Sequence, residues 1–135
     1  MKRKIIHSQA TEKFYTSLGI CEAVRIGQVI EVSGQVGWDE NSVPAKDFEG
    51  QVRLMFKNMI TVLEKAGASA NDIIELRMFV VPQKEMTLME MIDKAFQIKK
   101  ELMPENTCAA TGVGIAELVI PELMLECGAS AYIAE

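Results

Sequence analysis

The longest amphipathic segment of this 135-residue sequence is DFEGQVRLMFKNMITVLEKAG, which runs from Asp47 to Gly67. Its apolar residues recur every three or four positions, which is the spacing of one face of an α-helix. They are Phe48, Val52, Met55, Phe56, Met59, Leu63 and Ala66. Asp47 is a suitable N-cap, and Gly67 stands where a left-handed glycine commonly follows a helix. The pattern predicts a helix over residues 47–66 with one face in the core.

The segments around this helix predict a second helix and several strands. Thr87-Leu88-Met89-Glu90 has the form of a capping box, apolar residues at helical spacing follow it, and Pro104 marks the stop. Alternating or β-branched runs predict strands at residues 23–26, 29–36, 73–81, 110–116 and 123–133, with a further short strand at 4–6. In the second of these, Val32 and Val36 are expected on one face and Gln35 on the other.

The order β-β-α-β-α-β-β predicts a single α+β domain over residues 1–135, in which two helices back one mixed sheet. Apolar and small residues occur on both faces of several strands. Because two helices cover only one face, we expect a partner subunit on the other and therefore an oligomer.

Composition narrows the function classes. The chain has 14 basic and 19 acidic residues and a net charge of −5, which argues against nucleic-acid binding. No stretch has the length and apolarity of a membrane span, and the basic start lacks the hydrophobic core of a signal peptide. The three cysteines (Cys21, Cys108 and Cys127) cannot all pair within one chain, so we expect reduced thiols in a cytoplasmic protein.

Most standard catalytic motifs are missing. Gly112-Val113-Gly114 begins like a dinucleotide fingerprint, but Glu117 stands where the third glycine should be. His7 is the only histidine, and no His/Cys/Asp/Glu cluster has metal-ligand spacing. We therefore predict neither a metal nor a nucleotide cofactor.

Glu126 is the carboxylate with the most unusual setting, between Leu125 and Cys127 in an otherwise apolar strand. A strand glutamate more often faces solvent or lies at an edge. The alternative is a half-buried acid in a pocket, with a raised pKa that suits proton transfer. The residues themselves leave both interpretations open.

Several motifs, taken in order, resemble the Rid/YjgF family of RidA-like enamine/imine deaminases over residues 20–133. They are Val32-Ser33-Gly34-Gln35, Leu63-Glu64-Lys65-Ala66-Gly67, Asp72 leading into Met78-Phe79-Val80, Val113-Gly114-Ile115-Ala116-Glu117-Leu118, and Glu126-Cys127-Gly128-Ala129. The resemblance implies a chorismate-mutase-like fold assembled as a homotrimer around a central barrel. It also implies small-molecule sites in the clefts between subunits, where 2-imino acids are hydrolysed to 2-keto acids and ammonia.

The family's site is carried over only in part. The resemblance implies a water-activating role for Glu126 and ligand contacts from Ser33 and Gly34. The arginine that binds the substrate carboxylate falls on Ala110 in one alignment and on Asn106 in another, and neither can form a charged bidentate contact.

Other parts of the site follow from the same alignment. Thr111 and Gly112 follow the missing arginine and are expected to touch the ligand, as is Trp38 just past a strand end. Ile20 stands in place of a tyrosine. Arg25 and Arg53 are the other cations that could bind the substrate carboxylate in place of the missing arginine.

Three functions follow from these observations. The first is hydrolysis of a C=N intermediate to a carbonyl compound and ammonia, with Glu126 as general base. The second is a non-catalytic, metabolite-binding or regulatory trimer, which the missing arginine favours. The third is the endoribonuclease or translation-inhibitor activity often attached to this family, which the net charge of −5 argues against.

Overall fold

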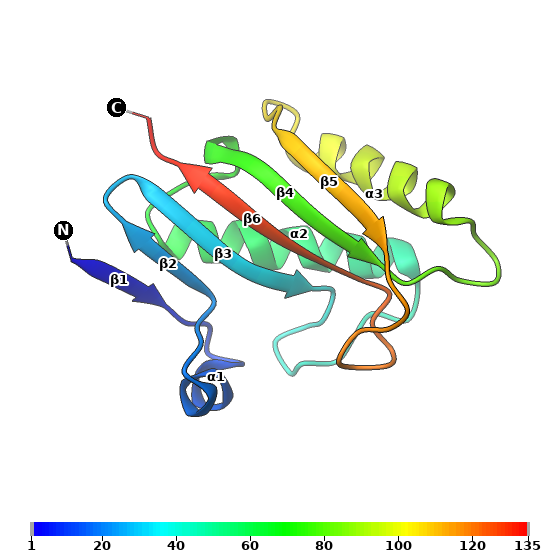
Figure 1. Cartoon of the computed structure of the whole chain (residues 1–135), viewed down its shortest axis with the longest axis horizontal. Helices are drawn as coiled ribbons and strands as arrows, with labels where there is room; N and C mark the ends of the chain where they lie inside the picture. Colours follow the sequence, from blue (N-terminus) through cyan, green and yellow to red (C-terminus); the bar gives the residue numbers. More distant parts are fainter. Residues whose placement is uncertain (1, 135) are drawn as a thin grey trace.

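The computed structural model describes residues 2–134, which form one six-stranded sheet and three α-helices (Figure 1). In chain order the elements are β1 (Arg3–Ile6), α1 (Glu12–Leu18), β2 (Ala23–Ile26), β3 (Val29–Val36), α2 (Phe48–Lys65), a 3₁₀ turn (Ala70–Asp72), β4 (Ile73–Val80), α3 (Leu88–Leu102), β5 (Ala109–Gly114) and β6 (Leu125–Tyr132). The strands and the two long helices lie within a few residues of their predicted positions.

The sheet is mixed. Its strands lie in the order β1-β2-β3-β6-β4-β5, and every neighbouring pair is antiparallel except β4 and β5. The parallel pair requires a crossover, which α3 provides. Helices α2 and α3 lie behind the sheet in Figure 1, and no helix covers the front face within residues 2–134. The prediction of an α+β domain with a mixed sheet is therefore confirmed.

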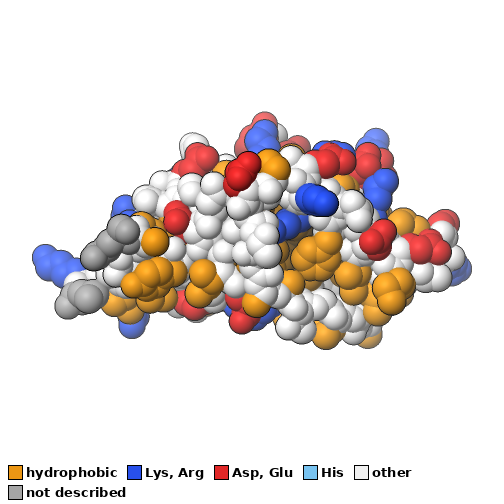
Figure 2. Space-filling model, turned by 90° about the horizontal axis from the view of Figure 1, so that it is seen from above, with side chains coloured by type: hydrophobic (Ala, Val, Ile, Leu, Met, Phe, Trp, Pro, Cys, Tyr) orange, Lys and Arg blue, Asp and Glu red, His pale blue; other side chains and the backbone are white. Residues whose placement is uncertain are grey.

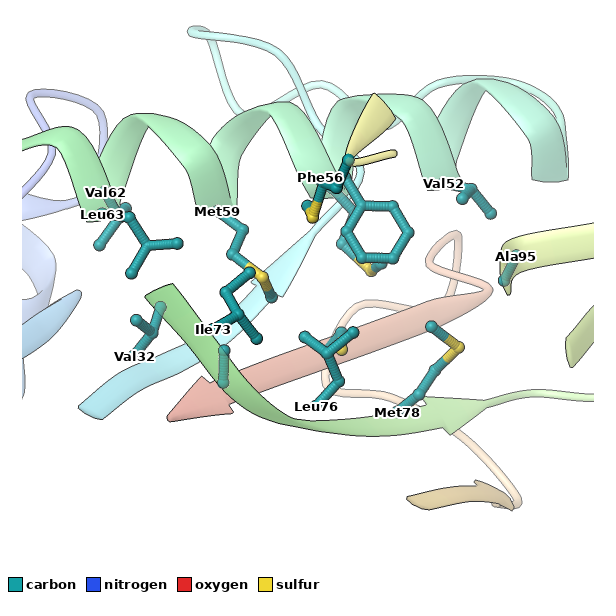
Figure 3. Close-up of a cluster of buried hydrophobic side chains, with 14 of the residues drawn as sticks. Val32, Val52, Phe56, Met59, Val62, Leu63, Ile73, Leu76, Met78 and Ala95 are labelled. Carbon is teal, nitrogen blue, oxygen red and sulfur yellow. The ribbon is translucent and has the colours of Figure 1, made fainter. Parts of the chain in front are cut away.

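Helix α2 forms as its sequence predicts. The Asp47 side chain accepts a hydrogen bond from the Gly50 N–H at 2.7 Å, and Gly67 adopts a φ of +87° after the last turn. Such caps satisfy backbone groups that have no partner within the helix. The apolar stripe of α2 then packs on Leu76 and Met78 of β4, as Figure 3 shows for Phe56 and its neighbours.

One buried polar residue connects α2 to two loops. Gln51 is fully buried, and its amide donates at 2.9 Å to the carbonyls of Ala45 and Glu122. Its side-chain oxygen accepts from the Met124 N–H at 2.8 Å. Three backbone groups are thereby satisfied by a single side chain, which fixes the segments that precede α2 and β6.

The uncovered side of the molecule is comparatively apolar. Among the exposed large hydrophobic residues are Val29, Val113 and Tyr132 on sheet strands, and all six residues of β5 are exposed. Figure 2 shows hydrophobic side chains gathered mostly on one side of the molecule and charged ones mostly along the opposite margin. Such a face is typical of a surface that contacts another chain.

Two details differ from the sequence prediction. Helix α1 was not expected, because none of its residues is buried and its periodicity is weak; Gly19, with φ +72°, terminates it. A register shift between Val32 and Gln35 also interrupts the alternation of β3. The shift pairs Gln35 with Cys127 and Val36 with Glu126. Gln35 therefore points toward the helices and Val36 toward the uncovered face, the opposite of what the alternation predicts for each.

Candidate functional site

Glu126 lies on the uncovered sheet face, near the end of the sheet where β6 begins. It sits on β6 between Val36 of β3 and Phe79 of β4 and is partly buried. Burial raises the pKa of Glu126 above the ordinary carboxyl value. A carboxyl group of this kind is suited to accept and return a proton near neutral pH.

Gly34 makes room for this carboxylate. A Cβ at position 34 would lie 2.6 Å from Cδ and 2.8 Å from Cγ of Glu126, well inside van der Waals contact. The side chain of Glu126 therefore lies across the bare backbone of β3. The structure thus brings Glu126 and Gly34 together.

Ser33 lies beside Gly34 and is exposed. Its hydroxyl donates to the carbonyl of Cys21 at 2.6 Å, and its N–H donates to the carbonyl of Glu22 at 2.8 Å. Both bonds tie β3 to the segment before β2. The hydroxyl proton of Ser33 is thus engaged within the chain, while its oxygen can still accept a hydrogen bond.

The predicted residues on β5 divide between the two sides of the strand. Thr111 pairs with Arg77 in the register of β4 and β5. A Cβ at Gly112 would lie 3.2 Å from Cδ1 of Ile92 on α3, so that position faces the helices. Alternation places Ala110 on the same side as Gly112, and Thr111 on the uncovered face.

Asn106 is the other position at which the alignment places the family's arginine, and it lies in the interior, where it forms hydrogen bonds within the chain. It is buried, and its amide donates to the carbonyl of Ile73 at 3.0 Å. The backbone carbonyl of Asn106 accepts from the ammonium of buried Lys99 at 2.8 Å. These bonds hold the segment between α3 and β5 against the start of β4.

The cations considered for substrate binding are engaged elsewhere. Arg25 donates to the carbonyls of Gly27 at 2.8 Å and Ala66 at 2.6 Å. Arg53 pairs with Glu101 at 3.1 Å on the outer surface of the helices. Neither guanidinium is directed at Glu126, which forms no ion pair with any residue between 2 and 134.

Arg77 of β4 also lies on the uncovered face. Its guanidinium bonds to Glu75 at 2.8 Å and to the Ser130 hydroxyl at 3.1 Å, and it lies 3.5 Å from Glu31. Glu75 and Arg77 therefore form an ion pair, and both side chains remain partly exposed. Arg77 pairs with Gly128 in the register, one alternate position along β6 from Glu126.

Tyr15 is a site residue that sequence reasoning missed. Burial raises its pKa, and the nearby carboxylates of Glu22 and Glu126 raise it further. The Tyr15 N–H donates to the Thr11 carbonyl at 2.8 Å, so these two residues stack on one face of α1. The signal available in the sequence was the four-residue spacing of Thr11 and Tyr15, followed by a glycine at position 19.

Trp38 lies beyond the end of β3 and lines a cavity together with Glu22 and residues of α2.

Cys127 is fully buried, and burial raises the pKa of its thiol to about 12. Residues 2–134 contain no group of three potential His, Cys, Asp or Glu metal ligands. No helix in that range has the length and apolarity to cross a membrane.

Comparison with known proteins defines the class. The family model described as endoribonuclease L-PSP matches residues 12–133. The chain therefore belongs to this family, which includes the YjgF, RutC and Rid proteins.

Individual relatives agree with this membership. The RutC family protein YjgH of Escherichia coli is 35% identical over 79 residues, which cover 58% of this chain and 60% of that protein. A Dermatophagoides farinae protein named 2-iminobutanoate/2-iminopropanoate deaminase is 25% identical over 99 residues, or 72% of this chain and 73% of that one. A solved structure of YjgH superposes with a TM-score of 0.81 at 28% identity, covering 100% of this chain and 99% of that one.

Proposed function

We propose that this protein hydrolyses a small imine or enamine to a carbonyl compound and ammonia, with Glu126 as the general base. The observation that carries the proposal is the partly buried carboxyl of Glu126, whose pKa is raised and whose side chain lies across Gly34. A relative with 25% identity bears the name of an imino-acid deaminase.

The chemistry requires successive proton transfers at one position. Water adds to the carbon of a protonated C=N group, and Glu126 takes the proton that the water loses as the C–O bond forms. Glu126 then returns this proton to the nitrogen. As the C–N bond breaks and ammonia leaves, Glu126 takes the hydroxyl proton and the C=O bond forms; ammonia finally carries this proton away as ammonium. A carboxyl with a raised pKa is suited to accept and return protons in this way. Its negative charge also stabilises the iminium ion.

Other predicted residues would bind the substrate. Thr111 on the uncovered face and Ser33 beside Gly34 carry the hydroxyls available for ligand hydrogen bonds. The backbone of Gly34, over which the Glu126 side chain lies, and the backbone of Gly112 would line the floor of the site.

We also propose that the chain acts as a homotrimer, with the sites in the clefts between subunits. Support comes from the exposed strand β5, whose residues are all accessible, and from the apolar side chains on the uncovered sheet face. An exposed edge strand is prone to pairing and is normally covered. Light scattering coupled to gel filtration should give three times the chain mass of 15.0 kDa.

The substrate that fits this chain best lacks a carboxylate. Ala110 and Asn106 carry no charge, and Arg25 and Arg53 bond elsewhere. Arg77, on the same face as Glu126, is already paired with Glu75 and Glu31. Loss of a charge-assisted contact to a buried carboxylate costs about 2–5 kcal/mol. This chain would therefore represent a branch of the family without the carboxylate-binding arginine.

The test is imine hydrolysis by the purified protein. An amino-acid oxidase supplies 2-imino acids and an amine oxidase supplies imines without a carboxylate, while semicarbazide traps what remains unhydrolysed. We expect the protein to lower trapping more strongly with the carboxylate-free imines and Glu126→Gln to abolish the effect. Glu75→Gln is the matched control, because Glu75 is a carboxylate on the same face that pairs with Arg77.

A non-catalytic metabolite-binding trimer is the second candidate, favoured because Glu126 forms no ion pair with any residue between 2 and 134. It predicts ligand binding without turnover in either imine series. Endoribonuclease activity, the third interpretation, is disfavoured by the net charge of −5. Cleavage of RNA at physiological salt by the wild type would revive it.

A further inference from the structure

A cavity of about 500 Å³ lies between α2 and the loops at residues 8–10 and 38–41. Its wall on α2 is a stripe of residues spaced three or four apart, among them Lys57, Thr61 and Lys65. Glu22, Gln35 and Trp38 line it as well. The volume falls in the range typical of small-molecule sites.

Glu22 is a buried carboxylate in the lining of this cavity. It is 4% exposed and accepts hydrogen bonds from Ser8 at 3.2 Å, from Thr11, and from the Gln35 amide at 2.7 Å. These donors are neutral, and no cation within residues 2–134 forms an ion pair with Glu22. A buried carboxylate without a counter-ion attracts a cationic group.

The carboxylate has room for one more donor. Gln35 is the one side chain among residues 2–134 that donates to its Oε2 atom, and a carboxylate oxygen can accept two hydrogen bonds. Both Glu22 and Gln35 border the cavity, so the remaining acceptor site can be reached from it.

The loop that carries Trp38 is firmly held. Asn58 of α2 donates to the carbonyls of Val36 at 2.9 Å and Trp38 at 3.0 Å. Asp39 Oδ1 accepts from the N–H groups of Asn41 at 2.8 Å and Val43 at 3.0 Å. An indole ring in a preformed wall can bind a cation through its π face.

The charges of the lining favour a cation in the interior. Glu22 is buried, whereas Lys57 and Lys65 are exposed at the α2 wall, where solvent screens their charge. The Lys65 ammonium also donates to the carbonyl of His7 at 3.3 Å. Leu54 and Val62 add apolar surface for a hydrocarbon group.

We propose that this cavity binds a small molecule that carries a primary ammonium group. The ammonium donates to Glu22 and lies near Trp38, and the hydrocarbon part contacts Leu54 and Val62. This site is separate from the Glu126 site, and the proposal does not depend on catalysis there.

The chain has a single tryptophan, so emission under tryptophan-selective excitation reports on Trp38 alone. At constant ionic strength, 2-phenylethylammonium chloride should change this emission with saturation. Its dissociation constant should be at least about ten-fold lower than that of the neutral 2-phenylethanol, a difference of about 1.4 kcal/mol. The anionic 3-phenylpropionate should bind more weakly than either. Equal affinity for the cationic and neutral probes, or no saturable change with any probe, would overturn the proposal.

Variants locate the binding. Glu22→Gln should weaken 2-phenylethylammonium binding at least ten-fold, about 1.4 kcal/mol. Because Glu22 also holds Ser8 and Thr11, Thr61→Arg provides a second test. Thr61 is exposed and bonds to Lys57 within its own helix, so an arginine there enters the cavity without disturbing the core.

Thr107→Arg is the matched control for Thr61→Arg, since it makes the same charge change at an exposed loop position outside the cavity lining. Binding should be lost in Thr61→Arg and kept in Thr107→Arg. Unchanged binding in a folded Thr61→Arg protein would refute the assignment of this cavity.

Discussion

Replacement of Gly34 by alanine would place a methyl group against the carboxylate of Glu126. The added Cβ would lie 2.6 Å from Cδ of Glu126, whereas ordinary van der Waals contact begins at 3.4 Å. The carboxyl group must therefore move by about 0.8 Å, the difference between these two distances. A misplacement of about 1 Å at a reacting group can lower the rate by about 10²-fold. We expect a loss of this order in kcat for imine hydrolysis.

The same substitution should change stability little. The atoms that the new methyl meets are at the end of a flexible, partly exposed side chain, which can rotate away. We expect the free energy of unfolding to fall by less than about 1 kcal/mol. Urea unfolding of the Gly34→Ala protein, measured beside its kcat and KM, separates the two effects.

Gly37→Ala is the contrasting control. Its Cβ would lie 2.6 Å from the backbone carbonyl carbon of Gln51, inside helix α2, where no side-chain rotation relieves the clash. We expect a loss of about 2–3 kcal/mol. Full activity in Gly34→Ala, alongside an inactive Glu126→Gln, would refute the idea that Gly34 positions the carboxylate.

Three further predictions use the remaining perturbed or buried groups. Burial raises the pKa of Glu126, so the folded state binds its proton more tightly than the unfolded chain. The wild type should therefore lose stability relative to Glu126→Gln as the pH rises from the pKa of Glu126 in the unfolded chain through its pKa in the folded protein. Urea unfolding free energies of the two proteins that change with pH in the same way would contradict this. The Cys127 thiol, with a pKa of about 12, should resist iodoacetamide until the protein is denatured, as mass spectrometry can check. Gln51→Leu leaves three backbone groups without their partner and should cost about 3–5 kcal/mol in urea unfolding; a loss below about 1 kcal/mol would contradict that reasoning.

The long elements were predictable because their stabilising interactions are local and periodic. The stripe of α2 and the cap at Asp47 appear directly in the sequence, and so does the alternation of β6. Helix α1 was not predictable in this way, because no buried residue marks its face. Its position depends on the contact of Thr11 with Glu22, a buried polar pair that has no hydrophobic period.

The candidate site was predictable only in part. Glu126 was singled out by its apolar neighbours and by the family resemblance, and in the structure it is partly buried with a raised pKa. The contribution of Tyr15 arises from tertiary structure, because α1 must fold back toward β2 before the phenol can lie near two carboxylates. The facing of Thr111 likewise depends on the pairing register with β4, which no local pattern encodes.

The register shift in β3 shapes the surroundings of two carboxylates, Glu126 and Glu22. Val32 pairs with Ala129, and uninterrupted pairing from there would place Gln35 opposite Glu126. The extra residue instead places Gln35 opposite Cys127, and its amide reaches Glu22. Gly34, the residue before it, then lies beneath Glu126. One inserted residue thus supplies the bare backbone on which Glu126 rests and the donor that solvates Glu22, because a bulge redirects the side chains that follow it.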